Sequence, residues 1–417
     1  MDATTIGAHP VYFRESLLLR SIGTLFSGQN GVLFAINSVT ALAFAFILPV
    51  MSLFLITELN APPAYLGIYT TLTAIITIIV SQKLTALIDQ GVPSKRLFLF
   101  SLLGIIASAV GFSFAQTFWH ALLIGCTAMP IASSAIPLLL TIIRNYADSS
   151  GQNSAKLNSQ MRSSVSLLWI FGPPLAFISV EHLGFTTNYY LSIAFALAVI
   201  LIVTFGLKLP QANRVVKTKE QHDALPKQVW FLAFITLLAN IGNSTYINGM
   251  PLLITREMGL PTSYPGFLFG LTAAVEIPVM LLAVGWAERW NKPAVIRIGF
   301  VSAMAFYVGM FYAQTMPVLL ALQILNGIFF GIFVGLGVTI MQDYAPNNIG
   351  KASAIYTNAM LIGTMIGTSS MGVISQYFGF RMILLSSLIA ISFAFIALSI
   401  FMLRNPNHVN NELVTPC

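Results

Sequence analysis

Apolar stretches long enough to cross a lipid bilayer recur along almost the whole of this chain. A helix of about 20 apolar residues spans the hydrocarbon core of a membrane. The 417 residues are 57% hydrophobic and only 8% charged, with a mean hydropathy of +0.83. Soluble domains carry charge on roughly a quarter of their residues, so the composition excludes an ordinary soluble fold. The sequence predicts an integral membrane protein with many spans.

The apolar stretches form two sets of six, which predicts an all-α membrane fold of twelve transmembrane helices. The expected spans are 31–56, 64–87, 97–115, 118–143, 160–180, 186–207, 229–254, 264–286, 294–313, 316–341, 351–375 and 380–403. The longest polar run of the chain separates the two sets. The predicted parts are an N-terminal tail at 1–30, a first half at 31–207, a linker at 208–228, a second half at 229–403 and a C-terminal tail at 404–417.

Basic residues gather on one side of this predicted layout. All of the 20 Lys and Arg residues except Arg256 and Arg381 fall in or beside the tails, the linker and the even-numbered connections. Because cytoplasmic connections keep an excess of Lys and Arg, this side and both termini are predicted to be cytoplasmic. The first 29 or so residues lack the apolar core and small-residue cleavage site of a signal peptide, so we expect a cytoplasmic tail.

The two predicted halves resemble each other in sequence. Residues 55–57 and 253–255 are both Leu-Ile-Thr, and residues 72–74 and 271–273 are both Leu-Thr-Ala. The matches share an offset of about 199 residues. Such an offset indicates duplication of a six-helix unit, and an even number of helices per unit gives the two halves the same orientation.

Glu276 is the only one of the 13 acidic residues that lies deep inside a predicted span. No basic residue in that span neutralises it, and burial of a lone carboxylate in hydrocarbon costs several kcal/mol. Such groups usually bind a proton, an ion or a substrate. No histidine falls inside a predicted span, and Thr77 is the first-half counterpart, so Glu276 is the candidate proton-coupling residue. The alternative is an acid that stays protonated and hydrogen-bonds a neighbouring helix.

Amides and aromatic residues within the spans form the candidate substrate site. Asn and Gln offer donors and acceptors to hydroxyl groups, and aromatic faces pack on sugar rings. At helical spacing Asn243 shares a face with Asn240, and Gln323 shares one with Asn326. The alternative is that these amides only hold helices together. The candidates are Asn243, Tyr246, Asn248, Gln323, Asn326, Tyr356 and Asn358.

The predicted helices, the repeat and two charged connections resemble the major facilitator superfamily. The connection after the second span, from Thr85 to Arg96, keeps the acid and the final basic pair of the superfamily's loop signature, but lacks its leading glycine and the arginine after the acid. A degenerate copy follows the eighth span. The resemblance implies that Asp89, Glu288 and Arg289 belong to a charge network that latches the cytoplasmic gate. The alternative is ordinary solvated charge.

Several longer stretches are similar to the sugar efflux transporter family of bacterial inner membranes. The similarity covers about residues 40–400, and its motifs are the segments 144–151, 162–176, 243–251, 276–278, 323–326 and 356–358. The family exports sugars and glycosides, with proton antiport as the expected energy source. Gly172 and Pro173 correspond to the core of the antiporter signature, although its flanking glycines are missing. The resemblance also implies gating by Arg144 and Arg162, which could instead only reach lipid headgroups.

The sequence therefore predicts a proton-coupled exporter of sugars or glycosides that works by alternating access in the bacterial inner membrane. Sugar, protons and membrane lipid are the expected partners, and we expect a monomer. The net charge of +7 follows from topology and indicates no nucleic-acid partner. Nucleotide-binding motifs, metal-ligand clusters and nucleophile–base pairs are not evident, so neither a cofactor nor an enzyme is expected. An exporter of drugs or amphipathic metabolites, and a ligand sensor without flux, are the alternatives.

Overall fold

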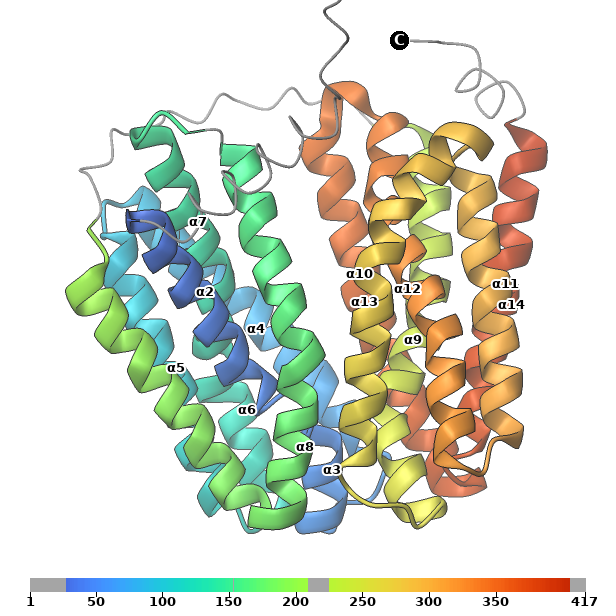
Figure 1. The fold of residues 1–417 in the computed structure, drawn as a ribbon, viewed down its shortest axis with the longest axis horizontal. Helices are drawn as coiled ribbons and strands as arrows, with labels where there is room; N and C mark the ends of the chain where they lie inside the picture. The colour runs from blue at the N-terminus through green and yellow to red at the C-terminus, as the bar shows by residue number, and fades with distance from the viewer. Residues whose placement is uncertain (1–27, 153, 209–224, 406–417) are drawn as a thin grey trace, which may run out of the picture.

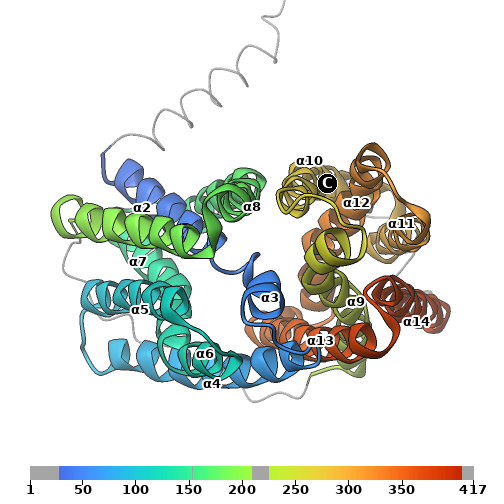
Figure 2. The ribbon, with the colours of Figure 1, turned by 90° about the horizontal axis from the view of Figure 1, so that it is seen from below.

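The computed structural model describes residues 28–152, 154–208 and 225–405, and all regular elements in this part of the chain are helical. The helices form two bundles that lie side by side (Figures 1 and 2). The N-terminal bundle contains α2 (Gly28–Ala45), α3 (Met51–Leu53), α4 (Tyr65–Asp89), α5 (Ser94–Phe114), α6 (Phe118–Ser133), α7 (Ala135–Ser149) and α8 (Ser154–Leu201). The C-terminal bundle contains α9 (Lys227–Leu252), α10 (Tyr264–Trp290), α11 (Lys292–Tyr312), α12 (Met316–Asp343), α13 (Ile349–Phe378) and α14 (Met382–Arg404).

Short helical turns complete the bundles. They are the π-helical segments η1 (Phe54–Glu58), η2 (Ile202–Gly206) and η3 (Leu253–Glu257), and the 3₁₀ turn η4 (Pro346–Asn348). Among the described residues, nine helical segments are long and apolar enough to cross a membrane, which supports the predicted multi-pass membrane fold. The long α8 contains a reversal at Gly184, whose φ of 78° favours glycine. In Figure 1 the chain turns back at the lower end of this helix.

Two predicted spans are less regular than the sequence suggests. The span predicted at 31–56 is interrupted after Ala45. In a continuous helix the ring of Pro49 would clash with the backbone carbonyl of Ala45, four residues earlier. The span predicted at 118–143 divides into α6 and α7 around Ser134, whose hydroxyl donates to the carbonyl of Pro130 at 2.9 Å. By contrast, α8 continues through Gly172 and Pro173 with helical φ and ψ at both residues.

A similar arrangement of hydrogen bonds joins the first and fifth helices of each bundle. Asn37 of α2 donates to the carbonyl of Met161 at 2.7 Å and to the hydroxyl of Ser164 at 2.9 Å. Asn240 of α9 donates to the carbonyl of Met360 and to the hydroxyl of Thr364, at 2.5 and 2.9 Å. Each asparagine clamps the first helix of its bundle to the fifth.

Removal of the second clamp should destabilise the protein measurably. Asn240→Ala is expected to lower the free energy of unfolding by about 1–2 kcal/mol, because it removes two hydrogen bonds between α9 and α13 in an apolar environment. Thermal unfolding in detergent is the measurement. The matched control is Asn358→Ala, since Asn358 is exposed on α13. Equal melting temperatures for the two variants would contradict the clamp.

The two bundles touch at one end only, as far as the described residues show. This closed end is formed by the turns at 58–64, 181–185, 257–263 and 376–381 and lies at the bottom of Figure 1. There α4 packs on α13 and α8 packs on α10: a Cβ added to Gly266 would lie 2.8 Å from Cα of Pro174, and Thr71 and Ser369 approach within 3.4 Å. At the opposite, linker end, the described ion pairs and hydrogen bonds stay within one bundle, as between Lys292 and Asp343.

Candidate functional site

Glu276 lies half-buried in the middle of α10, on the side of the helix that faces the protein. Exposed α10 residues such as Phe267, Leu281 and Leu282 lie on the opposite side. The backbone of Glu276 packs closely against α12. A Cβ added to Gly331 of α12 would lie 2.8 Å from the carbonyl oxygen of Glu276. Within the described residues, the carboxyl group makes no hydrogen bond or ion pair. A carboxyl group held inside the protein without a fixed partner is free to exchange a proton or meet a ligand.

A polar hub lies one helical turn from Glu276 and joins three helices. Gln323 of α12 is fully buried, and its Oε1 accepts from the hydroxyl of Thr272 of α10 at 2.9 Å. Its Nε2 donates to the hydroxyl of Tyr246 of α9 at 3.0 Å. Asn326 donates to Gln323 Oε1 at 3.2 Å. Of the seven candidate substrate residues, Tyr246, Gln323 and Asn326 lie together in this hub. Thr272 was not among the candidates, and its spacing of four from Glu276 was the available signal.

Asn326 brings an unpaired acceptor to this hub. Its Oδ1 is buried, and no donor approaches it within the described residues. A buried carbonyl without a partner costs roughly 1–3 kcal/mol, so such an atom usually marks a ligand, a water or a second conformation. Thr272, Glu276 and Asn326 together therefore offer hydroxyl, carboxyl and amide groups at the interface of α10 and α12.

Tyr246 differs from the expected role of a ring that packs on substrate. Its side chain is 1% exposed and points at α11, where the ring of Phe306 lies edge-on at 5.0 Å and that of Tyr307 at 5.9 Å. Only its hydroxyl reaches the hub. In this conformation Tyr246 positions Gln323 and fills the core of the C-terminal bundle.

The remaining candidates for the substrate site differ in whether their side chains already have hydrogen-bond partners. Asn248 donates to the carbonyl of Ser244 at 2.9 Å and the hydroxyl of Thr368 at 3.1 Å, so its amide group ties α9 to α13. Asn243 is buried, yet its amide makes no hydrogen bond within the described residues. Tyr356 of α13 packs its ring against Gly337 of α12, and Asn358 is exposed on α13. Outside the hub, Asn243 and Asn358 are therefore the candidate amides that make no hydrogen bond among the described residues.

The predicted gating residues lie toward the linker end, with two exceptions. Arg144 is exposed, 3.9 Å from Asp148 in its own helix, and Glu288 and Arg289 are exposed without an ion pair in the described structure. The side chains of Asp89 and Arg162 lie outside the described residues. A charge latch across the linker end therefore stays a prediction.

Gly172 and Pro173 are the exceptions, because both lie at contacts of α8. A Cβ on Gly172 would lie 2.6 Å from that of Ala45 in α2. The Pro173 carbonyl faces Gly266 of α10, where an added Cβ would lie 2.9 Å away. This stretch of the antiporter-like segment therefore forms part of the surface between the two bundles.

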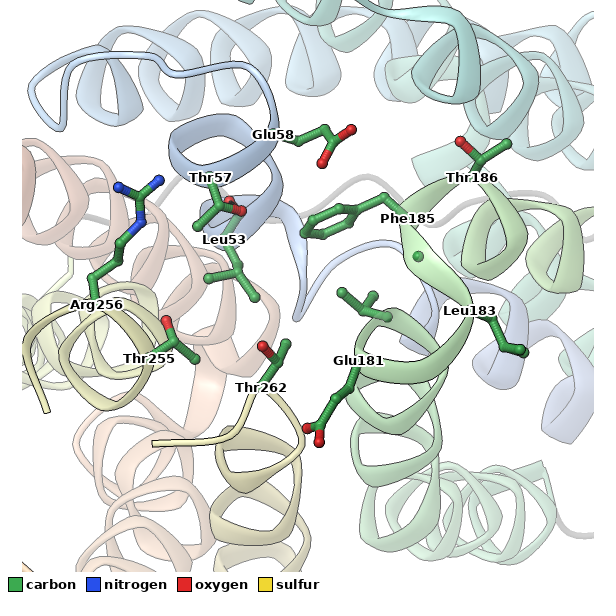
Figure 3. Close-up of a pocket in the computed structure, with 12 residues that line it drawn as sticks. Leu53, Thr57, Glu58, Glu181, Leu183, Phe185, Thr186, Thr255, Arg256 and Thr262 are labelled. Atoms are coloured by element: carbon green, nitrogen blue, oxygen red, sulfur yellow. Dashed lines mark hydrogen bonds between the residues drawn. The ribbon is translucent and has the colours of Figure 1, made fainter. Parts of the chain in front are cut away.

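Several polar contacts cross between the bundles at the closed end: besides the contact of Thr71 with Ser369, the backbone N–H of Ala64 donates to Oε1 of Gln376 at 3.2 Å. Arg256 of η3 donates from Nη2 to the carbonyl of Ile56 of η1 at 3.1 Å, and the backbone N–H of Ser263 donates to Oε2 of Glu181 in α8. Figure 3 shows that Arg256 and Glu181 lie on different sides of a pocket. These contacts would have to break before the closed end could open.

Comparison with known proteins identifies relatives over almost the whole chain. A sequence model of the Major Facilitator Superfamily matches residues 33–238 and 232–415. The protein named sugar efflux transporter A of Escherichia coli (strain K12) is 33% identical over 368 residues, which cover 86% of this chain and 93% of that protein. Sugar efflux transporter B of Salmonella typhimurium is 33% identical over 358 residues, covering 84% and 90%.

Solved structures show the same fold at low sequence identity. The crystal structure of the nucleoside transporter NupG has a TM-score of 0.76 and 14% identity, and covers 89% of this chain and 98% of that one. A bacterial homolog of the lysosomal transporter Spinster, in an inward-facing and occupied conformation, has a TM-score of 0.71 and 14% identity, covering 99% and 100%. Both similarities extend over the two helical bundles described above.

Proposed function

Because this chain belongs to the major facilitator superfamily, and within it to the sugar efflux transporter family, we propose that it exports sugars or glycosides across the bacterial inner membrane by proton antiport. The observation that carries the proposal is the 33% identity to sugar efflux transporter A, which extends over 93% of that protein. The neutral donors and acceptors of the hub suit a hydroxylated, uncharged substrate. Proton coupling rests on Glu276, which lies one turn from the hub.

The proposed topology has twelve spans and both termini in the cytoplasm. It counts α8 as two spans because of the reversal at Gly184, and it adds the α2–η1 and α13 helices to the segments that already have spanning length and hydropathy. Lys95, Lys208 and Lys292 lie at the linker end, whereas Arg256 and Arg381 lie at the closed end. The positive-inside rule then makes the linker end cytoplasmic.

With this topology, the conformation is closed toward the periplasm. Alternating access would open the closed end as the linker end closes, and the bundles would rock about the site between them. The cycle that we propose loads a proton on Glu276 from the periplasm and releases it to the cytoplasm. Sugar and proton bind alternately, because Thr272 and Asn326 hold the sugar beside the carboxyl group.

A flux assay with purified protein in lipid vesicles tests the proposal. Glucose, sucrose and methyl β-glucoside are offered under an imposed pH gradient, with empty vesicles as the blank. We expect saturable movement of at least one of the three, which the others inhibit, and a raised half-saturation concentration in Asn326→Ala. Asn347→Ala is the matched control, since Asn347 is an exposed amide outside the candidate substrate residues. Flux of amphipathic drugs that simple sugars do not inhibit would refute the sugar assignment.

A further inference from the structure

A pocket lies at the closed end, separate from the hub. Its volume is about 480 Å³, and both bundles contribute to its walls. Glu58 of η1 and Glu181, Phe185 and Thr186 of α8 come from the N-terminal bundle, while Arg256 of η3 and Thr262 come from the C-terminal one (Figure 3). Cavities of several hundred Å³ are of the size that holds small ligands.

The polar groups of the pocket suit a hydroxylated ligand. Glu58 is exposed and makes no ion pair or hydrogen bond within the described structure. Glu181 uses one carboxylate oxygen for the N–H of Ser263 and keeps the other. The hydroxyl of Thr255 donates to its own helix at the carbonyl of Pro251, 2.7 Å away, which leaves its oxygen to accept. Carboxylates accept strongly from vicinal hydroxyls, the guanidinium of Arg256 supplies donors, and the Phe185 ring offers an apolar face.

The arrangement does not suit a metal ion. Glu58 and Glu181 lie on opposite sides of the pocket in Figure 3, so their oxygens do not converge on one point. No group of His, Cys, Asp and Glu among the described residues has metal-binding geometry. The two separated carboxylates and the single aromatic face of Phe185 instead suit a molecule that carries several hydroxyl groups along its edge.

We propose that this pocket is a second binding site for the exported sugar or glycoside, on the outer face of the transporter. The identity of the ligand rests on the proposed function, and the position of the site rests on the pocket. Since the walls belong to both bundles, the site is complete only while the closed end is closed. A sugar bound there contacts both bundles and opposes their separation. External sugar therefore holds the transporter in the conformation that faces the cytoplasm and slows further export.

Equilibrium binding to the full-length protein in lipid nanodiscs tests the second site. The probes are radiolabelled glucose, sucrose and methyl β-glucoside, taken in the same panel as the flux assay. We expect two sites per chain for the transported probe. Glu58→Gln combined with Thr186→Val should weaken one site by about tenfold or more, because a hydrogen bond to a charged group is lost. Asn326→Ala should weaken the other, with Asn243→Ala as a second variant.

The matched control is Glu257→Gln. Glu257 is the repeat counterpart of Glu58 and also lies at the closed end, but outside the pocket, where it pairs with Arg381 at 3.6 Å. This variant should keep both sites. One site per chain, lost in Asn326→Ala and unchanged in the Glu58 variant, would overturn the outer site and leave the proposed transport intact. If no probe crosses the vesicle membrane but Glu58-dependent binding remains, the outer site stands and the transport proposal fails.

Discussion

Glu276→Gln is expected to abolish sugar accumulation driven by a pH gradient while sugar exchange at equal concentrations continues. Glutamine keeps the size and the hydrogen-bonding capacity of the acid and removes its proton exchange. One pH unit corresponds to about 1.4 kcal/mol, enough for about a tenfold sugar gradient if one proton moves per sugar. The variant should therefore reach no gradient in vesicles where the native protein reaches about tenfold.

The comparison needs a control with the same chemical change elsewhere. Glu257→Gln is this control, because Glu257 lies at the closed end, away from the hub. The glutamine side chain can still accept a hydrogen bond from the backbone N–H of Arg381. We expect this variant to accumulate sugar as the native protein does. If Glu276→Gln also accumulates sugar like the native protein, the acid is a structural hydrogen-bonding group and the coupling proposal is wrong.

Gly266→Ala is expected to shift the transporter away from the conformation described here. The new Cβ would meet Cα of Pro174 at 2.8 Å and the carbonyl oxygen of Pro173 at 2.9 Å, and neither backbone atom can move aside easily. Overpacking of this kind costs about 1–3 kcal/mol. Because the collision exists only while α8 and α10 are in contact, the cost falls on the closed state, and the population should shift by about tenfold or more toward opening at this end.

Accessibility of a cysteine buried between the bundles at the closed end, outside the pocket, measures this shift. Ser263, which is buried and contacts Glu181 of the other bundle, is replaced by cysteine in a chain whose Cys126 and Cys417 are replaced by serine. Labelling of Ser263→Cys with a membrane-impermeant maleimide is followed in vesicles. Labelling should rise about tenfold with Gly266→Ala, and the export rate should fall. Gly285→Ala is the matched control on the same helix, since a Cβ there meets nothing within 4 Å. Equal labelling of the two variants would show that the contact is not part of the gate.

The amino-acid sequence determined the class of fold, the family and most of the polar residues within the membrane. Apolar length and the bias of Lys and Arg act locally, since each span must satisfy its own backbone in lipid, so spans can be read without tertiary information. The isolated charge of Glu276 was visible for the same reason. The shared face of Gln323 and Asn326 followed from helical periodicity alone.

Only the tertiary structure decided which helices meet and therefore what each polar side chain does. Asn248 and Tyr246 looked like equivalent candidates, yet Asn248 ties α9 to α13 and Tyr246 turns toward α11. Thr272 gained its place in the hub because α10 lies against α12. The closed end and its pocket depend on contacts between bundles that are far apart in the chain. The residue pattern along a single helix therefore identifies components of the site. It does not show at which end the two bundles are in contact.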